Sequence, residues 1–469
     1  MAAGLTNDRK VMKMSTLAEA LSKITDPSRV LTGRAIRPYL ADSTEQRGLI
    51  GVADVVVLPN DVSEVKEVVI WASQKRVSLT PRGGGTGYSG GAVPVGGVVV
   101  SLERLDRVRS FDPLLWRIEV EAGVTTARVQ RLARENGLYY PPDPGAAEQS
   151  HIGGNIATNA GGPHSFKYGV TRQWVTGLEV VVPPGEILRL GGSVRKDVAG
   201  YDLCSLFVGS EGTLGIITSA WLRLLPAPEM TYPVAATYRN ARDGFAALQS
   251  AMVAGEVPGV LDYLDAATLR IAAPSFPEPG TVPSGFMVLA EVDGAAETAG
   301  RARTQLMDAM GEGATFIHAP VSGRDVSAFW RWRSGVPIAV DGYLGGKVSE
   351  DIAVPLDRLV EAIDGTLEIG QRHGLEACSW GHAGDGNLHS SFLFSRDDAV
   401  AAAAAQASVI DLFDLAVELG GTISGEHGLG SVKSGHLRRM WSSAAVRRHE
   451  DIKRLFDPEA ILNPGTKRA

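Results

Sequence analysis

The sequence predicts an α+β protein in which a cofactor-binding domain is followed by a domain built on an antiparallel sheet. Over residues 51–226, strand-like and helix-like segments alternate, and glycine-rich loops follow many of the strand-like runs. Pro226-Ala-Pro228 marks a boundary. After it, helix-like runs such as 241–254 alternate with strand-like runs such as 285–292. A chain of 469 residues is long enough for two or three domains with substantial cores.

Composition and charge exclude some classes of protein. The hydrophobic content of 44% and charged content of 21% are ordinary for a globular protein. The formal net charge of -7 argues against nucleic acid as a partner, because such proteins need a basic surface. Cys204 and Cys378 lack disulfide-framework and metal-ligand spacing, which favours a reducing, cytoplasmic location. Residues 1–10 lack the apolar core of a signal peptide, and we expect the alanine tract 399–405 to lie in a packed helix ending near Leu419.

The first elements of the cofactor domain are two strands with a helix between them. Residues 53–58 form a buried strand, and Asp61, with Glu64 three residues later, is expected to cap the helix. Residues 77–80 form the next strand. The glycines of segment 81–91 follow at once, and they let backbone N–H groups approach an anion such as a pyrophosphate.

This glycine-rich segment is not a Rossmann loop, although residues 85–90 match G-x-G-x-x-G and Asp106 follows at a suitable distance. A Rossmann loop opens a helix, whereas residues 91–97 contain Pro94 and lead into a strand at 98–102. We therefore predict a phosphate cradle without a Rossmann helix. The sequence has no G-x-x-x-x-G-K-[ST] motif, so a Walker-type site is not supported.

Further glycine-rich segments occur at 141–147, 152–162, 196–203 and 209–218. Small residues in extended or looped backbone leave room for a flat ring system and expose amides to its polar edge. Tight packing between elements explains any one segment equally well. Four of them in one domain favour a large cofactor.

The second domain carries a cluster of histidines. His382 and His389 flank Asp385-Gly386, a dipeptide typical of a tight hairpin turn, so both rings are expected across the mouth of one hairpin. Glu426 and His427 follow between further glycines. Two imidazoles and a carboxylate can bind a metal with open positions, and the last histidine can act as a base. The alternative is a set of packed, hydrogen-bonded histidines.

Taken together, these segments resemble the FAD-linked oxidases with a vanillyl-alcohol-oxidase-type FAD domain. The motifs are, in order, PRGGGTGYSGG, IGGNIATNAGG, GYDL with GSEGTLGIIT, HAGDGNLH, SGEHGLG and FDPEAILNPG. The resemblance is narrowest to D-2-hydroxy-acid dehydrogenases: D-lactate dehydrogenases, D-2-hydroxyglutarate dehydrogenases and the FAD subunit of glycolate oxidase. It implies a p-cresol-methylhydroxylase-type FAD domain of two α+β subdomains, an α+β substrate cap with an antiparallel sheet, and a C-terminal segment that returns to the FAD domain. We expect a helical lead-in at 1–45, the FAD domain at 46–226, the cap at 227–440 and the C-terminal segment at 441–469.

The resemblance implies that FAD is bound non-covalently. Residues 82–87 would wrap the pyrophosphate, 142–147 and 153–162 would line the flavin and ribityl chain, and 211–217 would approach the adenosine half. The expected cofactor-binding residues are Arg82, Gly83, Gly84, Gly85, Thr86, Gly87, Pro142, Gly145, Ala146, Gly153, Gly154, Asn155, Thr158, Asn159, Gly161, Glu211, Gly212, Gly215, Ile217 and Asn463.

The resemblance also implies a metal and a substrate site in the cap. The expected ligands of a divalent metal, with zinc as the first choice, are His382, His389 and Glu426. His427 matches the general base. The expected substrate-binding residues are Arg333, Lys347, His382 and His389, of which the first two match residues that hold a carboxylate.

The implied reaction is oxidation of a D-2-hydroxy acid to the 2-oxo acid. The metal would lower the pKa of the hydroxyl, His427 would take its proton, and the α-hydrogen would pass as hydride to flavin N5. Pro337 and Ser391 stand where 2-hydroxyglutarate enzymes tend to carry threonine and asparagine, which favours D-lactate or glycolate. The electron acceptor stays open among oxygen, a quinone, a cytochrome and an electron-transfer flavoprotein. Peripheral membrane association and a homodimer also stay open.

Three other functions compete with this interpretation. A metallohydrolase would use the same histidines but would leave the glycine cradle without a purpose. A non-catalytic FAD-binding subunit of a larger dehydrogenase complex would not be expected to keep His382, His389, Glu426 and His427 together. An alkyl-transfer synthase of the same superfamily would carry a run of consecutive histidines, which this sequence lacks.

Overall fold

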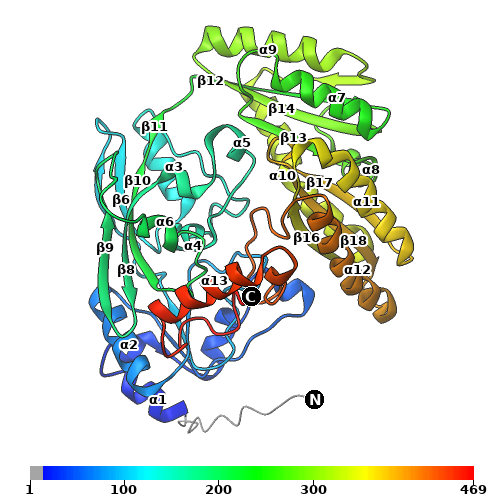
Figure 1. The fold of residues 1–469 in the computed structure, drawn as a ribbon. Helices are drawn as coiled ribbons and strands as arrows, with labels where there is room; N and C mark the ends of the chain where they lie inside the picture. Colours follow the sequence, from blue (N-terminus) through cyan, green and yellow to red (C-terminus); the bar gives the residue numbers. More distant parts are fainter. Residues whose placement is uncertain (1–13) are drawn as a thin grey trace.

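The computed structural model describes residues 14–469, and the strands in that range form four sheets (Figure 1). The first sheet has the order β1-β2-β4-β3. Its strands are β1 (Val30–Leu31), β2 (Val55–Val57), β3 (Leu79–Arg82) and β4 (Val98–Ser101). α1 (Met14–Leu21) and α2 (Val62–Lys75) pack against this sheet. β2 and β3 both run parallel to β4, so the glycine-rich segment connects two adjacent parallel strands.

The details of this sheet agree with the sequence pattern except in two respects. Asp61 accepts hydrogen bonds from two backbone N–H groups of α2, which confirms the predicted cap. Glu64, however, binds the guanidinium of Arg29 at 2.5 Å instead of closing back on the cap residue. The expected helical lead-in over 1–45 is only partly helical, because β1 pairs antiparallel with β2 and belongs to the sheet. Its residues 1–13 lie outside the described part of the chain.

The second sheet, of order β5-β6-β10-β8-β9, is antiparallel throughout. Its strands are β5 (Val108–Asp112), β6 (Arg117–Glu121), β8 (Val175–Val182), β9 (Glu186–Gly191) and β10 (Ile216–Arg223). The helices around it are α3 (Thr126–Glu135), α4 (Ile152–Thr158), α5 (Ser165–Tyr168) and α6 (Leu203–Phe207). β7 (Leu138–Tyr139) and β11 (Leu225–Pro226) form a separate pair. The four-stranded and five-stranded sheets have separate cores, as expected for two α+β subdomains.

The segment 152–162 differs from the expected loop, because its first part is the helix α4. Gly153 explains why a helix fits here: a Cβ at this position would lie 2.6 Å from the Cβ of Ala122. The small residue therefore allows close packing of α4 against the chain that follows β6.

The second domain is built on a seven-stranded antiparallel sheet of order β15-β12-β14-β13-β17-β18-β16. The strands are β12 (Met230–Tyr238), β13 (Val260–Leu264), β14 (Phe286–Gly294), β15 (Phe316–His318), β16 (Gly345–Ala353), β17 (Glu376–Gly381) and β18 (Asn387–Ser395). The helices are α7 (Ala241–Met252), α8 (Ala266–Ala272), α9 (Ala296–Gly311), α10 (Gly323–Leu344), α11 (Leu359–Arg372) and α12 (Ala399–Glu418). The predicted antiparallel α+β domain is confirmed.

Helices cover both faces of this sheet. α7, α9, α11 and α12 pack in one core, while α8 and α10 pack in the core of the opposite face. α12 contains the alanine tract, and it is long and apolar enough to cross a membrane by length and composition alone. In the structure it packs against the sheet through residues such as Ala405, Leu412 and Phe413, as predicted for a core helix.

The C-terminal segment returns to the first domain (Figure 1, orange to red). α13 (Ser443–Phe456) forms the first part of this segment and ends before Pro458. Beyond it, Leu462 lies beside Leu79 of β3, and Asn463 donates its backbone N–H to the carbonyl of Leu79 at 2.7 Å. Short 3-10 helices span Pro27–Arg29, Gly33–Tyr39, Ser43–Arg47, Thr171–Trp174, Ala273–Ser275, Leu356–Arg358, Ala383–Asp385 and Leu437–Arg439.

Candidate active site

A β-hairpin of the second domain carries the two predicted histidine ligands. β17 and β18 pair antiparallel, with Trp380 opposite His389. Residues 382–386 connect the strands through a 3-10 turn, so the hairpin is confirmed but its connection is longer than a two-residue turn. Gly386 has a φ of 65°, and a Cβ there would lie 2.0 Å from the carbonyl oxygen of Val354. Only glycine satisfies both conditions, and its turn brings His382 back towards His389.

His382, His389 and Glu426 form the cluster that the sequence predicts. One ligand atom from each residue lies within 4.8 Å of the others. His389 Nε2 is 3.3 Å and His382 Nε2 is 3.8 Å from Glu426 Oε1. The two imidazole nitrogens and the carboxylate oxygen are the donor types of a three-ligand zinc site with an open position.

A buried carboxylate and a guanidinium hold His382 in place. His382 Nδ1 donates to Asp262 Oδ1 at 2.8 Å, which leaves Nε2 facing the cluster. Asp262 in turn accepts from Arg333, at 2.9 Å from Nε and 2.6 Å from Nη2. Such carboxylate–histidine pairs orient metal ligands and fix their tautomer. The sequence assigned Arg333 to the substrate; in the structure this buried side chain binds Asp262, and a contact with substrate stays a prediction.

The protonation of the two histidines differs because their neighbours differ. Burial disfavours charge on His382, but the charge and hydrogen bond of Asp262 outweigh it and raise the pKa to about 9. Burial and the neighbouring histidines His427 and His382 lower the pKa of His389 well below its ordinary value. His389 is therefore neutral and can bind a metal through Nε2.

Asp351 of β16 holds the segment that carries Glu426 and His427. Its Oδ2 accepts the backbone N–H of Glu426 at 2.6 Å and that of His427 at 3.0 Å. Its Oδ1 lies 3.3 Å from His427 Nδ1 and also binds the buried ammonium of Lys433. Burial favours the neutral acid, but the charges of Lys433 and His427 lower the pKa of Asp351 well below its ordinary range. His427 therefore has a carboxylate at one ring nitrogen and presents the other, Nε2, 3.8 Å from Glu426 Oε1.

The first domain packs directly against this cluster. The ring of Tyr88, in the glycine-rich segment after β3, lies 5.0 Å from the ring of His427. Ser89 Oγ donates to the carbonyl of His427 at 3.0 Å. A Cβ on Gly161, just beyond α4, would lie 2.8 Å from Glu426 Oε2. The histidine cluster therefore lies at the domain boundary, against the loops that the sequence assigns to the cofactor.

Those loops converge on each other and leave open space. A Cβ on Gly83 would lie 3.4 Å from Gly154 of α4, and one on Gly84 would clash with the carbonyl of Gln149. At Gly145 and Gly154, in contrast, a Cβ would meet nothing within 4 Å. Nearby, His151 Nδ1 and Ser210 Oγ are buried without a hydrogen-bond partner among residues 14–469. Close-packed glycine backbone beside open space and orphaned polar atoms fits a pocket that a large polar cofactor completes.

Some predicted cofactor residues use their side chains inside the protein instead. The guanidinium of Arg82 donates to the carbonyls of Ala41, Ala92 and Pro38, which ties the N-terminal segment to β3. The prediction that Arg82 wraps a pyrophosphate is therefore not supported for its side chain. Glu211 accepts the N–H groups of Leu429 and Gly430 and binds Lys467. It anchors the Glu426 segment, and its approach to the adenosine half stays a prediction.

Other predicted cofactor residues are explained by packing or by local hydrogen bonds. Asn155 donates to Thr126 Oγ1 at 2.6 Å, and Asn463 donates to the carbonyls of Gly91 and Glu211. The hydroxyl of Thr158 donates to the backbone of α4, and the side-chain oxygen of Asn159 accepts the backbone N–H of Arg172. A Cβ would crowd neighbouring atoms at Gly153, Gly212 and Gly215. Ile217 belongs to a hydrophobic core. Cofactor contacts of these residues stay predictions.

Sequence reasoning missed Asp262, Asp351 and Lys433. All three are charged and buried, and Asp262 lies in β13, a strand that is otherwise apolar. A charge inside an apolar strand-like run is a usable signal, because a buried charge needs a partner. The sequence gives no indication of which partner it meets.

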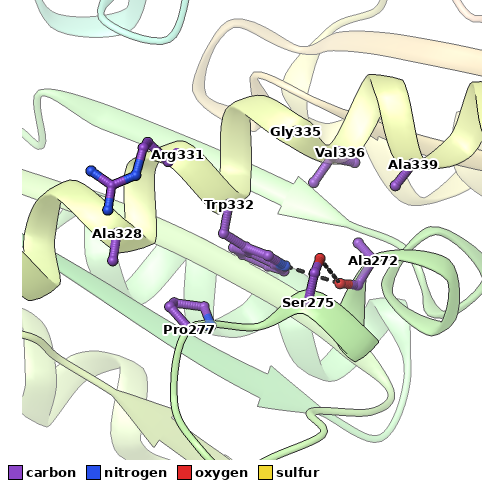
Figure 2. Close-up of a pocket in the computed structure, with 9 residues that line it drawn as sticks. All are labelled: Ala272, Ser275, Pro277, Ala328, Arg331, Trp332, Gly335, Val336 and Ala339. Atoms are coloured by element: carbon purple, nitrogen blue, oxygen red, sulfur yellow. Dashed lines mark hydrogen bonds between the residues drawn. The ribbon is translucent and has the colours of Figure 1, made fainter.

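Lys347 lies near the start of β16, four residues before Asp351. Its Nζ donates to the carbonyl of Pro337 at 3.1 Å and lies 3.7 Å from Asp341 Oδ1. A separate pocket between α8 and the outer side of α10 is lined by residues such as Trp332, whose indole donates to the carbonyl of Ala272 (Figure 2). None of the predicted site residues lines that pocket.

A glycine-rich cofactor cradle that faces a polar cluster across a domain boundary defines a two-domain cofactor-dependent enzyme. Residues 53–191 match the family described as FAD binding domain, and residues 227–466 match the family described as FAD linked oxidases, C-terminal domain. The second match covers more than half of the chain, and the chain belongs to the FAD-linked oxidase family. It is an FAD-linked oxidoreductase.

Curated relatives agree with this assignment. The chain is 35% identical to glycolate oxidase subunit GlcD of Bacillus subtilis over 92% of each chain. It is 32% identical to D-lactate dehydrogenase of Anaerostipes hadrus over 94% of each chain. It is also 35% identical to D-2-hydroxyglutarate dehydrogenase of Xanthomonas citri, over 87% of this chain and 88% of the relative. The fold matches that of 4-ethylphenol oxidase from Gulosibacter chungangensis, with a TM-score of 0.79, 19% identity and 99% of each chain covered.

Proposed function

We propose that this protein oxidises a D-2-hydroxy acid, D-lactate or glycolate, to the 2-oxo acid. FAD would be bound non-covalently, and a divalent metal, zinc in the first instance, would be bound by His382, His389 and Glu426. One observation carries the proposal: the cluster packs on the cofactor loops, with Tyr88 against His427 and Gly161 against Glu426. A substrate held at the cluster therefore lies beside the cofactor pocket. The curated relatives are named for reactions of this class.

The residues of the cluster fit a metal by their donor set and their support. His382 is oriented by Asp262, His389 is neutral, and Glu426 is fixed through its backbone N–H to Asp351. When bound, a divalent ion there would supply Lewis-acid stabilisation of an alkoxide-like oxygen, and FAD would supply a hydride acceptor. The open position of a three-ligand site leaves room for the oxygens of a 2-hydroxy acid.

His427 is the residue we assign as the base for the substrate hydroxyl. Asp351 at 3.3 Å from Nδ1 favours the tautomer with its proton on that nitrogen, so Nε2 is left as the acceptor. The ring of Tyr88 lies 5.0 Å from that of His427, and the imidazole of His389 stacks on it at 5.2 Å. The carboxylate also stabilises the imidazolium that forms when the proton arrives.

The site residues leave the electron acceptor open among oxygen, a quinone, a cytochrome and an electron-transfer flavoprotein. The free, separated cysteines Cys204 and Cys378 support a cytoplasmic location, as argued from the sequence. D-2-Hydroxyglutarate is the alternative substrate, because one relative carries that name.

Anaerobic flavin bleaching against a panel of D- and L-2-hydroxy acids tests the proposal. We expect D-lactate or glycolate to bleach the purified protein, L-lactate to be slower, and EDTA dialysis to abolish bleaching while the bound flavin remains. A colourless protein that hydrolyses esters or amides would indicate a metallohydrolase. A yellow protein that no hydroxy acid bleaches would indicate a non-catalytic FAD-binding subunit.

A further inference from the structure

Two buried carboxylates interrupt β14, a strand of the second domain that is otherwise apolar. Glu291 and Asp293 are two residues apart, so they point to the same face of the sheet. On that face Trp330 of α10 donates its indole N–H to Glu291 at 2.7 Å. A buried carboxylate is costly unless it is paired with a charge or hydrogen-bonded. Further partners of both carboxylates come from the first domain.

His164, the residue before α5, bridges the two domains. Its Nε2 lies 3.1 Å from Glu291 Oε1 in the second domain. Its Nδ1 lies 2.5 Å from Oδ2 of Asp143, in the segment 142–147 that is expected to line the flavin. Burial disfavours charge on the ring, but the charges and hydrogen bonds of the two carboxylates outweigh it and raise the pKa of His164 well above its ordinary value. At neutral pH the imidazolium therefore donates to both domains.

α5 makes the neighbouring contacts with the second domain. The ammonium of Lys167 pairs with Asp293, and the phenol of Tyr168 donates to Asp293 Oδ2 at 2.6 Å. Phe166 lies against the turn of the histidine hairpin, where a Cβ on Gly384 would be 2.5 Å from its ring. α5 therefore contacts both β14 and the hairpin that carries the two predicted histidine ligands.

The same stretch of chain also reaches the loops assigned to the flavin. It continues directly from 153–162, and a Cβ on Gly161 in that segment would lie 2.8 Å from Glu426 Oε2. His382, His389 and Glu426 all belong to the second domain, whereas the residues expected to line the flavin belong to the first. The histidine cluster can therefore keep its own geometry while its distance from the flavin depends on how the domains dock.

We propose that His164 is a positioning residue, which sets the separation between a substrate bound at the histidine cluster and the flavin. It acts through Asp143 on one side and Glu291 on the other, and Lys167 strengthens the same domain contact. Transfer of hydride needs close and aligned reacting atoms, so a small change in docking slows that step and spares substrate binding. The effect on rate rests on the proposed function, whereas the domain contact does not depend on the substrate.

The test compares His164→Gln with the wild-type holoenzyme in single-turnover reduction of FAD by D-lactate. Glutamine can still form hydrogen bonds but removes the positive charge between the two carboxylates. We expect the reduction rate to fall about tenfold or more, the scale of a misplacement of 1 Å or less, with the Kd of D-lactate and the metal content unchanged. A residue that served stability alone would lower the fraction of flavin that bleaches and leave the rate of the remaining molecules as in the wild type.

His373→Gln is the matched control. His373 Nε2 lies 3.0 Å from Asp411 Oδ2, and this histidine–carboxylate pair joins the end of α11 to α12 within the second domain. The same substitution there should leave the reduction rate unchanged. Lys167→Gln removes the other cation that faces β14, and it provides a second variant, with a loss of rate in the same direction, if His164→Gln folds poorly.

Hydrogen exchange of the same proteins needs no substrate. We expect amide exchange over residues 163–169 to be faster in His164→Gln than in the wild type and in His373→Gln, because the domain contact is weakened. An unchanged reduction rate, a loss of rate explained by weaker D-lactate binding, or unchanged exchange over 163–169 would each overturn the inference. If no hydroxy acid bleaches the wild-type flavin, the proposed function fails, and the exchange rates still decide whether His164 holds the domains together.

Discussion

Replacing Asp351 by asparagine perturbs the site at the residue with the most partners. The carboxylate accepts the backbone N–H groups of Glu426 and His427, faces His427 Nδ1, and binds the buried ammonium of Lys433. Asparagine keeps the shape but removes the charge, and its NH₂ group faces donors where an acceptor is needed. Two separate effects are expected, one on stability and one on turnover.

The stability effect follows from Lys433, whose side chain is 1% exposed. Removing one partner of a buried ion pair lowers the free energy of unfolding by about 3–5 kcal/mol, because the other charge is left without a counter-charge. Lys433 keeps Glu350 at 3.3 Å and donates to two backbone carbonyls, so we expect the lower end, about 3 kcal/mol. The folded-state pKa of Asp351 is lowered, so its stabilisation is present above the pKa of an unfolded aspartate, about 4, and is lost as the pH falls below that value.

The turnover effect follows from His427. Without a carboxylate at Nδ1 the ring can take the wrong tautomer, and a misoriented base costs about 10²- to 10⁴-fold in kcat. Urea unfolding of the holoenzyme measures the first effect and single-turnover flavin reduction measures the second. Asp351→Asn with Lys433→Met removes the unpaired ammonium, so we expect it to recover much of the stability and none of the turnover. A single variant with wild-type flavin reduction, or a double variant that regains turnover, would refute this reasoning.

Three further predictions concern the same site. His427→Ala should reduce single-turnover flavin reduction about a hundredfold or more while the flavin spectrum is retained, since a positioned base is worth that much; loss of flavin would instead indicate a structural role. His389→Ala should lower the metal content after dialysis, measured by elemental analysis, with FAD content unchanged; an unchanged metal content would show that the ligands are others. Gly161→Ala should push against Glu426 Oε2, 2.8 Å from the new Cβ, and lower kcat about tenfold or more. Gly300→Ala in α9, where a Cβ meets nothing within 4 Å, is its matched control and should leave kcat unchanged.

Local sequence patterns predicted the parts of the fold that depend on neighbours in the chain. The cap at Asp61 and the hairpin between His382 and His389 follow from short-range hydrogen bonding and turn chemistry. The helical lead-in was predicted less well. Residues 30–31 form the strand β1 because they pair with β2, and this pairing joins segments that are distant in the chain. The segment after residue 152 was expected to be a loop for its glycines, yet tertiary packing against Ala122 makes it a helix.

In the candidate site, too, the sequence predicted what depends on residue type and local context, and missed what depends on contacts between distant segments. The sequence identifies His382, His389 and Glu426 by residue type and glycine context, and the structure brings them together. The sequence cannot show that Arg333 would contact Asp262, because this contact joins residues on α10 and β13 that are far apart in the chain. The glycines illustrate the remaining ambiguity: at Gly154 a Cβ would meet no atom within 4 Å, whereas at Gly153 the missing side chain permits close packing against Ala122.

The proposed reaction transfers the C2 hydrogen of a hydroxy acid, held at the histidine cluster, to the bound flavin. Single-turnover reduction of the bound FAD by D-lactate carrying deuterium at C2 measures that transfer directly. We expect D-lactate with deuterium at C2 to reduce the flavin measurably more slowly than unlabelled D-lactate. The rate should fall further in His427→Ala. Equal rates for the two acids in a reaction that still oxidises lactate would contradict the account.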